Sequence, residues 1–185
     1  MLQHRVLIEA ATIAARVAAL AETIAGDTRS TELTVIGLLT GSFVFAADLV
    51  RALAGHGVDT LVDFMSVSHY GTGVQSTGLV QIRKDIAIDV RGQHVLLIDD
   101  ILDTGLTLDL VRGHLAARQP QSLRICVLLD KPDRRLVRID ADYVGFVIPD
   151  RWVVGYGLDL GGHGRGFSYV ATVEPSADTT EETAP

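Results

Sequence analysis

The sequence has few of the features that mark specialised classes of protein. Its 185 residues include one cysteine, Cys126, so no disulfide can form within the chain and a reducing, cytoplasmic location is expected. No apolar run approaches the roughly 20 residues of a membrane-spanning helix, and the opening MLQHRVLIEA lacks the form of a signal peptide. The histidines are scattered without the spacing of a zinc site. These absences indicate a globular protein without a disulfide framework, a zinc site or a membrane span.

Positive charge is also scarce. Lys and Arg total 16 against 23 Asp and Glu, which gives a formal net charge of −7. This balance argues against a nucleic-acid partner, because such a partner normally meets a basic face. An anionic substrate would need local groups, such as backbone N–H donors, a few cations or a bound metal ion. What the chain does have is 48% hydrophobic residues, enough for one domain with a substantial core.

Short apolar runs alternate with helical patterns along the chain. Ile13, Val17, Leu20 and Ile24 recur at helical spacing before Gly26. A second helix is expected from Phe43 to Leu53, with one apolar face formed by Phe43, Ala46, Ala47, Val50 and Leu53. A third helix is expected over about 107–117, and strands are expected over 33–39, 60–67, 79–82, 94–99, 122–130, 142–148, 151–158 and 168–174. The alternation predicts an α/β fold with a twisted, mostly parallel sheet flanked by helices, and ligands bind such sheets at the carboxyl ends of strands.

The stretch VLLIDDILDTGLTL, residues 95–108, carries the strongest chemical signal. Its apolar run ends in Asp99 and Asp100, and Asp103-Thr104-Gly105 then leads into the third helix. A tight turn before a helix aims N–H groups at an anion, and Thr104 and Thr107 add hydroxyl donors. The adjacent acids can accept hydrogen bonds from a diol or hold a divalent cation. Each piece alone is common, as a helix cap or as a solvated strand end, but their conjunction predicts a ribose 5-phosphate site.

This stretch resembles the phosphoribosyl-pyrophosphate (PRPP) motif of type I phosphoribosyltransferases. Its Ile-Leu-Asp-Thr-Gly form is most similar to the 6-oxopurine, or hypoxanthine-guanine, branch of that family. VDFMSVSHYGTGVQSTG (62–78) resembles the family's strand and mobile catalytic loop, LLDKPDRR (128–135) its purine-binding lysine segment, and DYVGFVIPDRWVVGYGLDL (142–160) its base-binding hood. The resemblance runs from about Ile36 to Phe167. It implies the type I fold in one domain over 1–174, with a hood formed mainly by 142–174 and the N-terminal segment. Composition alone predicts a disordered tail over 175–185, because PSADTTEETAP is acidic, Thr-rich and poor in apolar residues.

The resemblance also implies an activity, which is purine salvage. The 5-phosphoribosyl group of PRPP would pass to N9 of hypoxanthine, and of guanine, giving IMP or GMP and pyrophosphate. The reaction would depend on Mg²⁺ and pass through a transition state with oxocarbenium character, which electrostatic stabilisation favours. Relatives form dimers or tetramers, so a homodimer or homotetramer is expected, with the helix from Phe43 to Leu53 as a contact.

Residue roles around PRPP follow from the same resemblance. Asp99 and Asp100 would hold the ribose hydroxyls and Mg²⁺. Asp103 would exchange a proton with purine N7, and a neighbouring phosphate should raise its pKa. The 5′-phosphate would be surrounded by Asp103, Thr104, Gly105, Leu106 and Thr107.

On the base side, Lys131 would donate to the purine 6-oxo group and Trp152 would stack on the ring. From the residues alone, Lys131 is as well explained as a solvated strand-end lysine, and a lone strand Trp is more often part of a core. Val153 would offer backbone groups to the purine edge, and Asp159 would serve a second Mg²⁺ near the purine 2-position. Arg165 falls at the position of the family's pyrophosphate arginine. The closing loop would contain Ser68, His69 and Tyr70.

Three departures from the family pattern stand out. Thr40-Gly41 replaces the usual Lys-Gly at the pyrophosphate site, which removes a cation but leaves backbone donors. His69-Tyr70 replaces Ser-Tyr in the loop. LGGHGRGF (160–167) is glycine-rich, so flexibility around Arg165 is expected. Three alternatives remain open at this point: a preference for xanthine or another base, a PRPP-sensing regulator, and a binding module without catalysis.

Overall fold

A six-stranded sheet forms the centre of the protein. The computed structural model describes residues 4–28, 32–69 and 80–173 of the chain. The strand order is β4-β3-β2-β5-β6-β7, and every neighbouring pair is parallel except β3 and β4. The predicted α/β fold with a mostly parallel sheet is confirmed. The strands are β2 (Glu32–Leu39), β3 (Asp59–His69), β4 (Val80–Lys84), β5 (His94–Leu102), β6 (Ser122–Asp130) and β7 (Tyr143–Val147).

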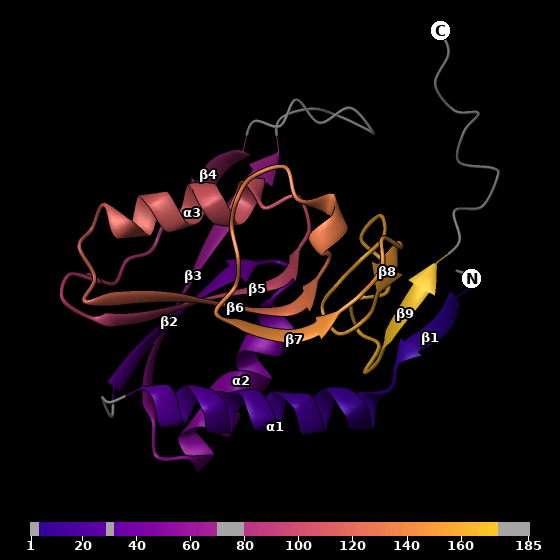
Figure 1. The fold of residues 1–185 in the computed structure, drawn as a ribbon, viewed down its shortest axis with the longest axis horizontal. Helices are drawn as coiled ribbons and strands as arrows, with labels where there is room; N and C mark the ends of the chain where they lie inside the picture. Colours follow the sequence, from indigo (N-terminus) through magenta and orange to yellow (C-terminus); the bar gives the residue numbers. More distant parts are fainter. Residues whose placement is uncertain (1–3, 29–31, 70–79, 174–185) are drawn as a thin grey trace, which may run out of the picture.

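Helices cover both faces of this sheet (Figure 1). α1 (Ala10–Asp27) and α2 (Phe43–Gly55) pack on one face, and α3 (Leu106–Ala116) packs on the other. The apolar run of β5 is explained by burial on both faces of the sheet. Leu96 and Ile98 enter the core beneath α1 and α2, and Val95 and Leu97 enter the core beneath α3. A single 3₁₀ turn, η1 (Pro132–Arg134), follows β6. Within the described residues, no helix is long and apolar enough to cross a membrane.

The predicted apolar face of α2 is only partly correct, because Ala46 and Leu53 are buried and Val50 packs against the core, but Phe43 and Ala47 are not buried. The buried residues are Phe45, Ala46, Leu49 and Leu53, whereas Phe43 is 40% exposed and Ala47 also faces solvent. Apolar residues lie almost all round FVFAADLVRALA, so helical periodicity allows more than one inward face. Packing against the sheet selects the face that contains Phe45, which is fully buried.

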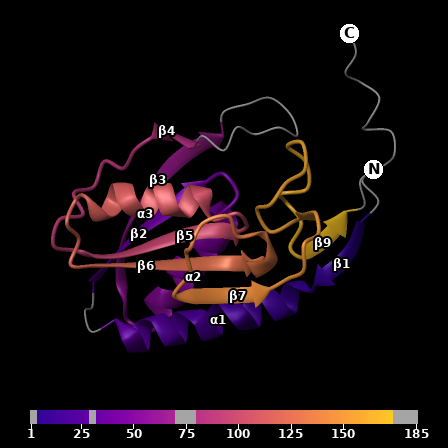
Figure 2. The same cartoon turned by 45° about the horizontal axis from the view of Figure 1, so that its top comes forward.

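A second, three-stranded sheet lies beyond the carboxyl ends of β5, β6 and β7 (Figures 1 and 2). Its order is β1-β9-β8, with β1 (His4–Ile8), β8 (Val153–Val154) and β9 (Val170–Val173) antiparallel. β1 was not predicted, because its mostly exposed residues give no clear alternation. The predicted strand over 151–158 is reduced to β8, since Gly155, Tyr156 and Gly157 all have positive φ angles that end it. β7, although inside the predicted hood range, belongs to the six-stranded sheet.

Candidate active site

The carboxyl ends of β2, β5 and β6 meet at one edge of the sheet, because these strands are parallel and adjacent. β2 delivers Thr40 and Gly41 to this edge. β5 delivers the two acids and the turn to α3, and β6 ends beside Lys131. The topology therefore gathers segments that lie up to about ninety residues apart in the sequence, at the edge where such sheets bind ligands.

Asp99 and Asp100 form a closely spaced acidic pair. Both belong to β5, which continues to Leu102 rather than ending at Asp99 as predicted. Asp99 is 8% exposed, and its Oδ1 accepts the N–H of Asp100 at 2.9 Å. Burial, followed by the charge of Asp100, raises the pKa of Asp99 well above its usual range. Burial also raises the pKa of Asp100, while Arg165 opposes that shift.

Such a pair has the chemistry of a partial Mg²⁺ site. Magnesium is commonly held by one or two carboxylates together with substrate phosphates and water. A nearby cation would also offset the buried negative charge. Within residues 4–28, 32–69 and 80–173, no group of three His, Cys, Asp or Glu side chains is placed to hold a metal ion. Asp99, Asp100 and Asp159 therefore do not make one three-carboxylate centre, and the donor set fits a metal whose shell a phosphate ligand completes.

The turn from β5 to α3 has the form of an anion-binding loop. Gly105 has φ +86°, and a Cβ at this position would lie 2.6 Å from Cγ2 of Ile139, so the close approach requires glycine. α3 begins at the next residue, Leu106, whose N–H lies 3.5 Å from Oγ1 of Thr104. In the part of the chain that the structure describes, the N–H groups of Thr104 and Gly105 have no hydrogen-bond partner. These free donors and the start of a helix suit a phosphate.

Asp103 and Lys131 lie in a network of alternating charges. Oδ1 of Asp103 accepts a hydrogen bond from Nε of Arg134 at 3.0 Å, and Oδ2 of Asp103 lies 3.9 Å from Nζ of Lys131. Asp150 pairs with the same two cations, at 3.6 Å from Lys131 and 3.4 Å from Arg134. Lys131 is only 6% exposed, which excludes a solvated strand-end lysine. Arg134 and Asp150 were not identified from the sequence, although Arg134 lies in the charge cluster DKPDRR.

The first turn after β2 packs tightly against the acidic pair. The Leu39–Thr40 peptide is cis. A Cβ on Gly41 would lie 1.7 Å from Oδ2 of Asp100, and a Cβ on Gly157 would lie 2.1 Å from the carbonyl oxygen of Gly41. Only glycine fits at position 157, where the conflict is with backbone, and a side chain at position 41 would require the Asp100 carboxylate or the loop to move. This absence of side chains brings the two loops and Asp100 together.

Arg165 joins the same corner of the site. Its Nη1 donates to the carbonyl of Gly157 at 2.7 Å, and its Nη2 lies 2.6 Å from Oδ1 of Asp159. Asp159 also accepts the N–H of Gly162 at 2.7 Å. Arg165 thus has defined partners within a stretch that was expected to be flexible, and Asp159 is occupied by protein donors.

Trp152 and Val153 lie on the small sheet. Trp152 is 64% exposed, so it is not a core residue, and its ring is open to a ligand. Its carbonyl accepts the N–H of Val173 at 3.0 Å, which anchors its backbone to β9. Val153 is buried and pairs with Thr172.

The segment predicted to form the closing loop is only partly described. Ser68 and His69 belong to β3, not to a loop, because β3 continues as a hairpin with β4. Ser68 pairs with Gln81, and its Oγ accepts Nε of Arg83 at 2.8 Å. Tyr70 and the rest of the predicted loop up to residue 78 lie outside the described residues.

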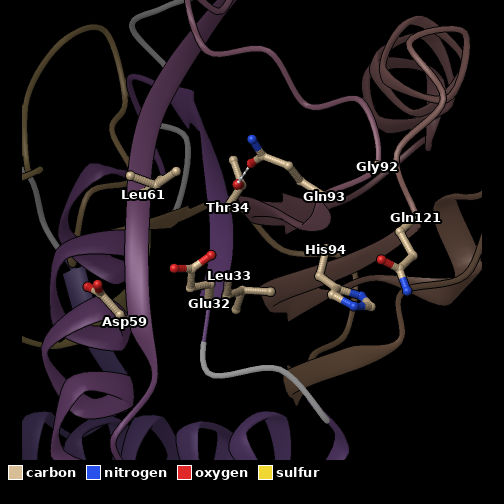
Figure 3. A pocket seen from close by; sticks show the side chains of 9 residues that line it. All are labelled: Glu32, Leu33, Thr34, Asp59, Leu61, Gly92, Gln93, His94 and Gln121. Atoms are coloured by element: carbon tan, nitrogen blue, oxygen red, sulfur yellow. Dashed lines mark hydrogen bonds between the residues drawn. The ribbon is translucent and has the colours of Figure 1, made fainter.

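A cavity of about 310 Å³ lies at the opposite, amino-terminal edge of the sheet (Figure 3). Its polar side chains are mostly acidic or amide groups, and Thr34 bonds to the amide oxygen of Gln93. It offers no lysine or arginine to an anion. The lining residues are Glu32, Leu33, Thr34, Asp59, Leu61, Gly92, Gln93, His94 and Gln121. The candidate site is therefore the carboxyl edge, where cations, acids and free N–H groups converge.

Comparison with known proteins gives a consistent result. The family model for the phosphoribosyl transferase domain matches residues 7–160. The hypoxanthine-guanine phosphoribosyltransferase of Aquifex aeolicus (strain VF5) is 49% identical over 142 residues, which cover 77% of this chain and 78% of that protein.

Two solved structures are similar over nearly the whole chain. A hypoxanthine-guanine phosphoribosyltransferase from Bacillus anthracis superposes with a TM-score of 0.87 at 41% identity, covering 94% of this chain and 100% of that one. A hypoxanthine phosphoribosyl transferase from Trypanosoma cruzi gives a TM-score of 0.90 at 36% identity, covering 99% and 97%. That structure comes from work on how its C-terminal region affects oligomeric state and enzymatic activity.

Proposed function

Because this chain belongs to the phosphoribosyl transferase domain family, we propose that it transfers the 5-phosphoribosyl group of PRPP to N9 of hypoxanthine and of guanine. The products are IMP or GMP and pyrophosphate. One observation carries the proposal: the buried Asp99–Asp100 pair, the open N–H groups of the Gly105 turn and the Lys131 ammonium converge on one edge of the sheet. These groups match, in order, a ribose diol, a 5′-phosphate and a 6-oxopurine.

The sugar phosphate is assigned to the β5 end. Asp99 and Asp100 accept hydrogen bonds from the ribose hydroxyls, and the N–H groups of Thr104 and Gly105 bind the 5′-phosphate. Asp103, Leu106 and Thr107 complete the surroundings of the phosphate at the start of α3. Local donors of this kind allow a chain of net charge −7 to bind a polyanion.

The base is assigned to the Asp103–Lys131 pair. In a 6-oxopurine, N7 and the 6-oxo group lie on the same edge of the ring, so one acceptor and one donor side by side can bind both. Asp103 Oδ2 and Lys131 Nζ, 3.9 Å apart, supply that combination. Adenine would instead place an amino donor against the ammonium, which leaves both donors unpaired. Trp152 stacks on the exposed ring face, and Val153 and Asp159 border the opposite edge of the base.

Charge develops in two places during the transfer. The sugar becomes cationic at C1′ as its bond to pyrophosphate breaks, and Asp99 and Asp100 lie where they stabilise that charge. Asp103 exchanges the N7 proton of the base as N9 forms its bond, so this carboxylate handles a proton while the other two position the sugar. Arg165 and the backbone of Thr40-Gly41 are assigned to the leaving pyrophosphate, and the contacts of Arg165 with Gly157 and of Gly157 with Gly41 support this assignment.

Mg²⁺ fits the acidic pair and is the cofactor of the proposed reaction. When bound, it neutralises the negative charge that develops on the leaving pyrophosphate. Asp99 and Asp100 would hold one ion, and Asp159 would serve a second. Asp159 must exchange part of its bond to Arg165 for this role, because the two side chains are 2.6 Å apart.

The proposal extends to location and assembly. A cytoplasmic enzyme agrees with one buried, unpaired thiol, Cys126. A homodimer or homotetramer is supported by apolar side chains that remain exposed on α2 and on neighbouring β3, namely Phe43, Leu61 and Val62 at 40%, 54% and 39%. Sedimentation equilibrium of the purified protein tests this part, and a monomer at micromolar concentration would contradict it.

A spectrophotometric assay tests the function itself. The protein is incubated with PRPP, Mg²⁺ and each of hypoxanthine, guanine, xanthine, adenine and uracil. IMP and GMP should form, while adenine and uracil should give no nucleotide. A dominant rate with xanthine would change the assigned base, and no product from any purine would refute the proposal.

A further inference from the structure

We propose that Arg135 is a positioning residue for the phosphate-binding turn. It fixes the carbonyl oxygens on the back of the turn, so that the N–H groups on the front face the 5′-phosphate. Arg135 lies in the segment after β6, and no role for it was predicted from the sequence. The inference rests on the proposed function only in taking a 5′-phosphate as the ligand of the turn.

The Arg135 guanidinium gathers acceptors from two strand ends. Its Nη1 donates to the carbonyl of Leu102 at 2.7 Å, to the carbonyl of Asp103, and to the carbonyl of Lys131 at 3.3 Å. Its Nη2 forms an ion pair with Asp130, and both side chains are less than one-fifth exposed. A shielded pair of this kind is screened less by solvent than a surface pair. The guanidinium is therefore held in place and in turn holds the ends of β5 and β6.

Peptide geometry connects these bonds to the phosphate. In a trans peptide the C=O of one residue and the N–H of the next point in opposite directions, and both peptides of this turn are trans. Arg135 donates a hydrogen bond to the carbonyl of Asp103, so the N–H of Thr104, in the same peptide, points away from Arg135. The next residue, Leu136, donates its N–H to the carbonyl of Thr104 at 2.9 Å, so the N–H of Gly105 points the same way.

The carbonyl oxygens on one side of the turn are thus hydrogen-bonded, whereas the N–H groups on its other side are available to a ligand. The two N–H groups directed forward, those of Thr104 and Gly105, are the donors that have no hydrogen-bond partner among the described residues. A third contact supports the back. Nε of Arg135 donates to the carbonyl of Ile139 at 3.2 Å, and the Ile139 side chain packs against Gly105 together with Val137 and Cδ of Arg135. Arg135 therefore fixes both the hydrogen-bonded and the apolar support of the turn.

The other two parts of the site do not depend on Arg135 in the same way. The Lys131 ammonium is oriented by the carboxylates of Asp103 and Asp150. The pyrophosphate corner is built from Gly41, Gly157 and Arg165, which share no hydrogen bond or ion pair with Arg135 in the described structure. Loss of the guanidinium should consequently weaken ligands with a 5′-phosphate far more than pyrophosphate.

Isothermal titration calorimetry with two ligands tests this inference. IMP and magnesium pyrophosphate are titrated separately into the wild-type protein, Arg135→Gln and Arg135→Lys. Arg138→Gln is the matched control, because Arg138 is an exposed arginine of the same segment with no hydrogen bond or ion pair among the described residues. We expect Arg135→Gln to raise the Kd of IMP by about tenfold or more, Arg135→Lys to raise it by less, and the Kd of magnesium pyrophosphate to stay within about twofold.

Two outcomes would overturn the inference. One is an IMP affinity that does not change in either Arg135 variant. The other is an equal loss of both ligands, which would indicate general loss of structure. Arg135→Lys retains the charge and part of the contacts, so it provides the measurement if Arg135→Gln does not fold. A wild-type protein that bound neither ligand would refute the proposed function instead, which keeps the two failures distinct.

Discussion

The ammonium nitrogen of Lys131 lies 3.6 Å from a carboxylate oxygen of Asp150. Lys131 is 6% exposed, whereas the Asp150 side chain is 51% exposed at the rim of the site. A buried ammonium is unfavourable unless a carboxylate or another acceptor satisfies it. Asp150 thus pairs with the Lys131 ammonium and directs it, and the ammonium keeps donor hydrogens for the proposed contact with the 6-oxo group of a purine.

Asp150→Asn should weaken base binding rather than chemistry. The amide keeps the shape of the carboxylate but loses the charge that orients Lys131. We expect the KM for hypoxanthine to rise by about three- to tenfold while kcat stays within about twofold, measured at saturating PRPP. Asp133→Asn is the control, because Asp133 is an exposed aspartate two residues after Lys131. A fall in kcat with unchanged KM would contradict the positioning role.

Asp103→Asn should have the opposite kinetic signature. Asparagine can still hydrogen-bond to the purine and to Arg134, but it cannot take up the N7 proton. Loss of a general acid–base group lowers turnover by about 10²- to 10⁴-fold, and the KM for PRPP should change little. Asp109→Asn on the first turn of α3 is the control, since Asp109 pairs on the surface with Arg112 and with no other side chain of the described residues. Turnover near the wild-type rate would show that Asp103 carries no proton.

Gly41→Ala should disable the site through steric conflict. The added methyl group would lie 1.7 Å from Oδ2 of Asp100, so either the loop or the carboxylate must move. We expect a loss of kcat/KM for PRPP of more than about 10²-fold, together with a destabilisation of about 1–3 kcal/mol. Gly55→Ala at the end of α2 is the control, because no atom lies within 4 Å of a Cβ there. Equal activity of the two variants would be inconsistent with the close packing of Gly41 and Asp100.

Thr40→Lys should strengthen pyrophosphate binding. Thr40 is exposed at the end of β2, so a lysine fits without displacing the core and adds the cation that the family pattern has at this position. We expect the Kd of magnesium pyrophosphate to fall by about three- to tenfold at low salt and by less at high salt. Gln121→Lys, which adds the same charge at the opposite edge of the sheet, is the control. An unchanged affinity would mean that the backbone donors alone set pyrophosphate binding.

The sequence predicted the parts of this structure that depend on local pattern. The apolar run before Asp99 predicted a buried strand, and Asp-Thr-Gly predicted the turn into α3; both are observed. The buried face of α2 could not be fully predicted from the sequence, because apolar residues lie almost all round the helix and packing against the sheet determines which of them are buried.

The residues that support the site could not be predicted from the sequence either, and the reason is different. The partners of Arg135 include Asp103, 32 residues away in sequence, and a contact of that span leaves no periodic signal. The ion pair of Lys131 with Asp150 spans 19 positions and joins the end of β6 to the segment after β7. Contacts between strand ends are set by the strand order, which a single sequence does not display.

Asp63 should make the stability of the protein depend on pH below about 4. Its carboxylate accepts the N–H of Phe64 at 2.7 Å, the N–H of Ala87 at 2.6 Å, the N–H of Ile88 at 3.3 Å and Nζ of Lys84 at 3.1 Å. Burial disfavours the charge, but these donors lower the pKa of Asp63 from 3.8 to about 2. The unfolded chain therefore takes up the proton first as the pH falls. The stabilisation is present above about pH 4 and is lost as the pH drops to about 2.

Urea unfolding followed by circular dichroism between pH 7 and pH 2 measures this contribution. Asp63→Asn should lower the free energy of unfolding by about 1–2 kcal/mol at pH 7 and by progressively less towards pH 2, so the two curves converge. Asp59→Asn is the control, because Asp59 is exposed at the start of the same strand and, among the described residues, its carboxylate accepts a hydrogen bond from its neighbour Thr60 alone. Parallel curves for the wild type and Asp63→Asn across this range would show that Asp63 titrates alike in the folded and unfolded states.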